Sequence, residues 1–170
     1  MFNKVAIEKY FTGEKNESLI FILIGLTAII VAAVLIFYYK SSFTKGFAIP
    51  LILVAALQIA VGYTVYKRSD KDRTDNVYAF DLNPGKLKNE EIPRMEVVMK
   101  KFNIYRWVEI GLAITGLLLI LFFRTKTEQS FWYGMGAGLA IQSIIMLVAD
   151  FFAEKRGYEY LNGLKSFFDV

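Results

Sequence analysis

The chain has 170 residues, of which 55% are hydrophobic before its 12 glycines are counted, and its 20 basic and 16 acidic side chains give a net charge of +4. Soluble domains hold roughly 45–50% apolar residues with glycine included, so the composition favours a membrane protein. The absence of cysteine and histidine excludes disulfides, thiolate or imidazole metal sites, cysteine nucleophiles and Ser-His-Asp triads. We therefore expect no enzyme activity, no metal and no cofactor.

Four apolar runs of 20 to 22 residues follow one another along the chain. Each is long enough to cross a bilayer as a helix. Only three charged residues, Arg106, Glu109 and Asp150, lie inside these runs. The predicted fold class is an all-α integral membrane protein with four transmembrane helices arranged as two hairpins. The predicted spans, within a single membrane domain over 1–170, are residues 19–39, 47–66, 104–123 and 131–152.

The basic residues determine the predicted orientation. Segments 1–18, 67–103 and 153–170 carry 15 Lys and Arg residues, whereas the short connections 40–46 and 124–130 carry four. The positive-inside rule therefore places both termini and the central segment in the cytoplasm, which in a bacterium means the plasma (inner) membrane. The central segment also holds seven acidic residues, so we expect no nucleic acid. The expected partners are membrane lipids and either a second copy or another membrane protein.

The three cytoplasmic segments each contain an apolar stripe at helical spacing. In the central segment, residues 74–88 are rich in turn formers, and Asn89 with the two glutamates after it predicts a helix that runs into the third span. The stripes at 2–11 and 158–168 predict similar amphipathic helices. These helices either lie on the inner leaflet or pack together as a collar that offers a surface to a partner.

The two halves of the chain resemble each other. A shift of 84 residues superposes Phe47 on Phe131 and Gln58 on Gln142, although only 8 of 53 residues over 20–72 are identical. Duplication and chance similarity both remain open. A duplicated two-span unit keeps one orientation, so its symmetry axis lies along the membrane normal, unlike the inverted repeats of many transporters.

Two glutamines, Gln58 and Gln142, occupy the middle of their spans, where an unpaired amide is unfavourable. Their equal depth predicts that they pair. Small residues around them predict close helix approach, either within one chain or between subunits, with a polar pore or ligand lining as the alternative. These helix-packing residues are Ala55, Gly62, Gly134 and Gly138.

The charged residues inside the spans form the main candidate site. Arg106 and Glu109 share one helical face, and folding the second hairpin about its turn brings Asp150 within reach of Arg106, with Glu154 one turn beyond. Three interpretations follow: an ion-pair network that fixes hairpin register, a cation or proton site with Glu109 as the titrating group, and a lipid-headgroup site. The headgroup site would use Arg106, Lys155 and Arg156.

The sequence favours a non-catalytic structural or accessory membrane subunit that oligomerises through its small-residue helix faces. An oligomeric channel or ion pathway is the alternative, with Glu109 and Asp150 as the carboxylates and Gln58 and Gln142 at the midplane. A third reading is an intramembrane enzyme in which Glu109, Asp150 and Glu154 hold a metal.

Overall fold

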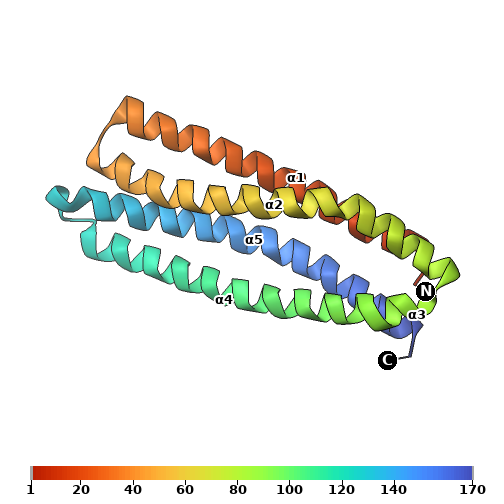
Figure 1. Ribbon diagram of the computed structural model, residues 1–170. Coiled ribbons are helices and arrows are strands. Elements are labelled where there is room, and N and C mark those ends of the chain that lie inside the picture. Colours follow the sequence, from red (N-terminus) through yellow and green to blue (C-terminus); the bar gives the residue numbers. More distant parts are fainter. Residues whose placement is uncertain (1, 170) are drawn as a thin grey trace.

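The structure is a computed structural model that describes residues 2–169, and no strand occurs within that range. Four long helices make up the molecule, which confirms the predicted all-α fold (Figure 1). They are α1 (Lys4–Val34, continued by the π-helical turn η1, Leu35–Tyr39), α2 (Ser42–Leu82), α4 (Ile92–Phe123) and α5 (Ser130–Phe167). Short elements connect them: α3 (Pro84–Lys86), the π-helical turn η2 (Leu87–Glu91) and the 3-10 turn η3 (Thr127–Gln129).

The helices are much longer than a bilayer is thick. All four long helices have the length and the apolar composition to cross a membrane. The 41 residues of α2 extend about 60 Å, whereas the hydrocarbon core of a bilayer measures about 30 Å. Each long helix therefore has a membrane half, near the short turns at 40–41 and 124–129, and an extramembrane half. We call residues 2–18, 67–103 and 153–169 the extramembrane half.

The turn predicted over 74–88 is wrong in its first part, because α2 continues to Leu82 and the chain reverses only at Asn83. Asn76 stays helical by donating its side-chain amide to the Asp72 carbonyl, 2.8 Å away. Pro84 then occupies the first turn of α3, where a missing N–H group costs nothing. The stripes at the two ends of the chain are likewise continuations of α1 and α5, not separate helices.

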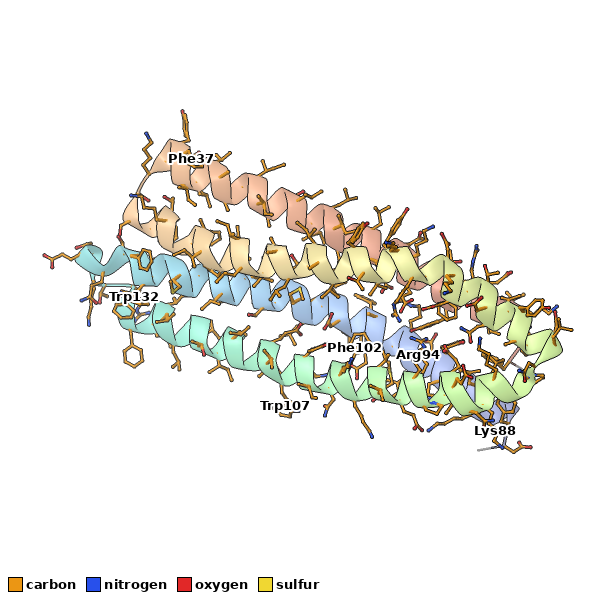
Figure 2. The ribbon with its side chains drawn as sticks, viewed as in Figure 1. Phe37, Lys88, Arg94, Phe102, Trp107 and Trp132 are labelled. Carbon is orange, nitrogen blue, oxygen red and sulfur yellow. The ribbon has the colours of Figure 1, made fainter. Side chains whose placement is uncertain are left out.

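The membrane half is an open row of helices. Helix α1 packs on α2, α2 on α5, and α5 on α4, while α1 and α5 share few contacts. Figure 1 shows this order, with α1 diverging from α5 and α4 toward the turn at residues 40–41, where it stays packed on α2. The outer surfaces carry large apolar side chains, including Phe37 and Trp107, which Figure 2 shows on the outer sides of η1 and α4. Such a surface suits contact with lipid.

The main hydrophobic core lies in the extramembrane half, where all four long helices converge. Ile7, Phe11, Met95 and Leu164 are almost completely buried there. The apolar stripes of the extramembrane half were expected either to lie on a membrane leaflet or to pack together, and the structure has them packed together. The remaining members of this core are Phe2, Tyr10, Ala79, Leu87, Ile92, Met99, Tyr160 and Leu161.

The two hairpins agree in length as well as in sequence pattern. Shifted by 84 residues, the helical stretch 4–39 becomes 88–123, while η2 and α4 together cover 87–123. Helices α2 and α5 run side by side in the same direction at the centre of the row. Two repeats related by an axis along the membrane normal would have this arrangement.

Candidate functional site

Two polar contacts join α4 to α5 at the end of the membrane half that adjoins the extramembrane half. Arg106 forms an ion pair with Glu154, and the carboxyl groups of Glu109 and Asp150 lie within hydrogen-bond reach of each other. Glu109 is 7% exposed and Glu154 is equally buried. The structure thus gathers all four charged residues of the predicted site, but pairs them differently from the prediction.

The predicted contact between Asp150 and Arg106 is replaced by the Arg106–Glu154 pair. Side chains on a helix lean toward its N-terminus. Because α4 and α5 are antiparallel, Arg106 leans toward the extramembrane half while Asp150 leans deeper into the membrane. Arg106 therefore meets Glu154, one turn beyond, and Asp150 meets Glu109. Asp150 was predicted as the partner because its backbone lies at nearly the same depth as that of Arg106, without regard to the direction in which the side chains lean.

The Glu109–Asp150 pair has no cation beside it. Among residues 2–169, no N–H or O–H group donates to the buried Oε2 atom of Glu109. Within the same range, no three His, Cys, Asp or Glu side chains come together as a metal site would require. Because Glu154 turns to Arg106, the carboxylate trio of the metal hypothesis is not assembled.

Gln58 and Gln142 pair as their equal depth predicted. The Gln142 side-chain amide donates to Gln58 Oε1 at 3.2 Å, and the Gln58 amide donates to the Met146 sulfur at 2.9 Å. The two glutamines are 3% and 4% exposed. The contact joins α2 to α5 and satisfies polar groups that have no water to bind.

We expect Gln58→Leu to lower the free energy of unfolding by about 1–2 kcal/mol, because Gln142 is left buried without its partner. Adding Gln142→Leu should recover most of that loss. Equilibrium unfolding of the two single variants and the double variant in mixed micelles gives the coupling energy. If the decrease in the free energy of unfolding of the double variant equals the sum of the decreases in the two single variants, the glutamines do not interact.

The small-residue faces are occupied within the chain. A β-carbon added at Gly134 would lie 2.1 Å from the Phe43 carbonyl oxygen on α2, and Gly138 approaches the same helix closely. Ala55 and Gly62 lie against α1. These four positions hold neighbouring helices of one chain together, so contact with another chain would need a different surface.

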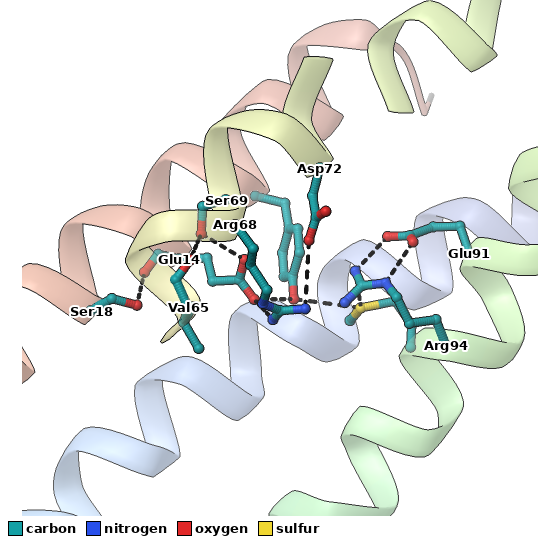
Figure 3. Close-up of polar contacts among 10 residues, drawn as sticks. Glu14, Ser18, Val65, Arg68, Ser69, Asp72, Glu91 and Arg94 are labelled. Atoms are coloured by element: carbon teal, nitrogen blue, oxygen red, sulfur yellow. Dashed lines mark hydrogen bonds and ion pairs between the residues drawn. The ribbon is translucent and has the colours of Figure 1, made fainter. Parts of the chain in front are cut away.

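A buried carboxylate network that the sequence did not reveal lies in the extramembrane half (Figure 3). Glu14 is 9% exposed, and its carboxylate accepts hydrogen bonds from Arg68 at 2.9 Å and Ser69 at 3.0 Å. The Tyr10 hydroxyl donates to it at 3.5 Å. Ser18 donates to the Glu14 carbonyl at 2.7 Å. The network fastens α1 to α2 where both leave the membrane.

A second ion pair continues the network toward α4. Arg94 donates two hydrogen bonds of 2.7 Å to the Glu91 carboxylate and lies 5.9 Å from the centre of the Phe11 ring. The Met95 sulfur accepts a hydrogen bond from Arg94 at 3.3 Å and lies 3.4 Å from the Tyr10 hydroxyl, whose single proton is shared between Met95 and Glu14. Polar contacts therefore connect α1, α2, η2 and α4 around the apolar core, where they fix the relative positions of the helices.

Two buried tyrosines stack beside this network, with the rings of Tyr10 and Tyr160 4.1 Å apart and nearly parallel. Burial raises the pKa of both hydroxyls above the usual 10.0, and the negative charges of Glu14 beside Tyr10 and Glu91 beside Tyr160 raise it further. A pKa raised by folding stabilises the folded state fully below the unfolded value and less as the pH rises above it.

The extramembrane half should therefore lose stability above pH 10, because the unfolded chain ionises these two hydroxyls first. Urea unfolding followed between pH 8 and 11.5 tests this. In the double variant Tyr10→Phe with Tyr160→Phe, the decline should be clearly shallower. Parallel curves for variant and wild type would contradict the assignment.

Local spacing contained a signal for these contacts. Glu14 lies one turn after Tyr10 and one before Ser18, on the side of the helix that carries Phe11. Glu91 and Arg94 stand three residues apart, at ion-pair spacing on a helix. A carboxylate that continues an apolar stripe marks a polar group facing the core.

Comparisons with protein-family models, with curated proteins and with solved structures found no match to this chain. The class that the fold defines is an all-α protein with four helices suited to crossing a membrane. Its function must therefore be argued from the contacts described above.

Proposed function

We propose that the protein is a non-catalytic structural or accessory subunit of a membrane, in which two hairpins carry a rigid extramembrane bundle. The observation that supports this most directly is that polar groups in the membrane half bind one another across helix interfaces. Gln142 donates to Gln58 and Arg106 pairs with Glu154. Such contacts fix helix register and do not leave a polar lining free for a substrate.

The proposed orientation places the extramembrane half in the cytoplasm. Its three segments, 2–18, 67–103 and 153–169, contain most of the basic residues and gather at one end of the molecule (Figure 1), in keeping with the positive-inside rule. A partner, whether a second copy or another membrane protein, would contact the outer apolar faces, because the small-residue faces are used within the chain.

Reconstitution into liposomes tests the proposal. We expect proton and potassium flux no greater than in protein-free liposomes, together with a defined mass in detergent by light scattering. Flux that rises in proportion to the amount of protein would overturn the structural role.

A proton pathway is the second candidate, because Glu109 is buried, interacts with the partly buried Asp150, and within residues 2–169 receives no hydrogen bond at its Oε2 atom. If this candidate is correct, wild-type protein conducts protons and the variants Glu109→Gln and Asp150→Asn do not. The matched control is Glu96→Gln in the extramembrane half, where the carboxylate pairs with Lys165 at 2.6 Å. Conduction unaffected by the membrane variants, or absent from the wild type, excludes a role for the pair.

A further inference from the structure

Positive charge in the extramembrane half is concentrated next to the membrane. We call the five residues beside each predicted span the boundary layer, which comprises residues 14–18, 67–71, 99–103 and 153–157. This layer contains eight basic and four acidic side chains, whereas the rest of the extramembrane half contains seven basic and nine acidic ones. Five helical residues extend about 7.5 Å, which is about the depth of the headgroup region of one leaflet. The excess positive charge therefore lies at the level of lipid headgroups.

Ion pairs use every carboxylate of the boundary layer. The pairs join α1 to α2, α1 to α5 and α4 to α5, so the four helix segments lie at one level. Each acidic side chain is thereby neutralised by an arginine or lysine from a neighbouring helix. The four pairs are Glu14–Arg68, Lys15–Asp70, Glu17–Arg156 and Arg106–Glu154.

Five lysines of the layer remain without an acidic partner. None of them forms an ion pair with any residue in the range 2–169, and all five are exposed. The protein does not compensate their charge, so contact with a negatively charged group is favoured at this level. We call them the boundary lysines: Lys67, Lys71, Lys100, Lys101 and Lys155.

We propose that the boundary lysines bind the headgroups of anionic phospholipids in the leaflet that adjoins the extramembrane half. This inference rests on the proposed placement of the protein in a membrane. A lysine carries its ammonium on a flexible stem, so lysines from α2, α4 and α5 reach phosphates at slightly different depths. Each lysine near an anionic leaflet favours the contact about fivefold.

The rest of the extramembrane half supports lipid as the occupant of this level. Its acidic side chains outnumber its basic ones, so an anionic leaflet repels it while attracting the boundary lysines. The packed core is therefore held away from the membrane surface. A soluble acidic protein would have to reach lysines that lie among the headgroups, where lipid is already in contact with them.

Trp107 provides a local reporter of the lipid around α4. Its side chain is 66% exposed on the outer side of the helix (Figure 2). It lies seven residues after Lys100, which places both side chains on one helical face. The chain has two tryptophans, so Trp132→Phe leaves Trp107 as the sole fluorophore of this kind.

The experiment uses this full-length single-tryptophan protein in phosphatidylcholine bilayers. Equal fractions of brominated phosphatidylcholine or brominated phosphatidylglycerol are added, and quenching of Trp107 by the two lipids is compared. We expect phosphatidylglycerol, the anionic lipid, to occupy sites beside Trp107 about fivefold more often than phosphatidylcholine. Lys100→Gln should remove most of this preference, and Lys100→Glu should reverse it.

The matched control is Lys88→Gln, which removes the same charge from an exposed lysine at the far end of the molecule (Figure 2). Lys88 precedes Lys100 by 12 residues, or about 18 Å along the helix. This distance is roughly twice the Debye length at physiological salt. The preference for phosphatidylglycerol should therefore stay unchanged in Lys88→Gln.

Equal quenching by the two lipids would overturn the proposal and leave the boundary lysines to an acidic protein partner. A loss of preference in Lys88→Gln as large as that in Lys100→Gln would also overturn it. Quenching by brominated phosphatidylcholine tests the proposed membrane placement separately. If neither lipid quenches Trp107, that placement fails, and the lipid proposal fails with it. If both quench equally, only the lipid proposal fails.

Discussion

Replacing Gly134 with alanine is expected to lower the free energy of unfolding by about 3 kcal/mol or more, at the upper end of overpacking effects. The new β-carbon would lie 2.1 Å from the Phe43 carbonyl oxygen. That oxygen belongs to the backbone of α2, so it cannot turn aside as a side chain would. Helices α2 and α5 would have to separate at the centre of the row. Unfolding in mixed micelles, followed by far-UV circular dichroism, measures the loss.

Gly111 supplies the matched control, since a β-carbon there would meet no atom within 4 Å. Gly111→Ala should be neutral or stabilising by up to about 1 kcal/mol, because alanine has the better helix propensity. If both variants behave alike, α2 and α5 do not approach as closely at Gly134 as described.

Phe11→Ala should destabilise the extramembrane half by about 3–5 kcal/mol, the usual cost of removing a large buried ring. Phe11 is 1% exposed and packs edge-on against Tyr10 and Tyr160. Hydrogen exchange should show faster opening of residues 2–18 and 153–169. The membrane half, which shares few contacts with this ring, should keep its helices.

The control for this change is Phe37→Ala in the membrane half, where the ring is 73% exposed. The free energy of unfolding of Phe37→Ala should stay within about 0.5 kcal/mol of the wild-type value. A larger effect at Phe37 than at Phe11 would show that the main stabilising core is not in the extramembrane half.

The four spans were predictable because an apolar run of 20 residues translates directly into a helix that crosses a bilayer. The pairing of Gln58 with Gln142 was also predictable, since two amides at equal depth have few other partners. The spacing of the spans did not predict that Arg106 pairs with Glu154. The choice between Asp150 and Glu154 depends on the direction in which side chains lean on antiparallel helices. Glu14 was missed because the predicted apolar stripe ended at residue 11 and did not include the carboxylate that continues it.

The continuity of the extramembrane helices was hidden for a related reason. Residues with turn propensity, such as Asn76, are held in α2 by tertiary contacts and side-chain bonds to the helix backbone. Local propensity is a weak predictor wherever a packed core compensates for it. The end of α2, by contrast, was predictable, because Asn83, Pro84 and Gly85 are three consecutive turn formers, whereas the isolated Pro50 lies inside α2.

Each long helix passes from the membrane half into the extramembrane core without a break, and this gives the molecule a mechanical property. The extramembrane arms are about 18–24 Å long, so a tilt of about 5° in a span displaces the end of an arm by roughly 2 Å. The core at that end is closely packed and resists deformation. If a change in bilayer thickness or lateral pressure tilts the spans, this geometry predicts strain or movement in the extramembrane core.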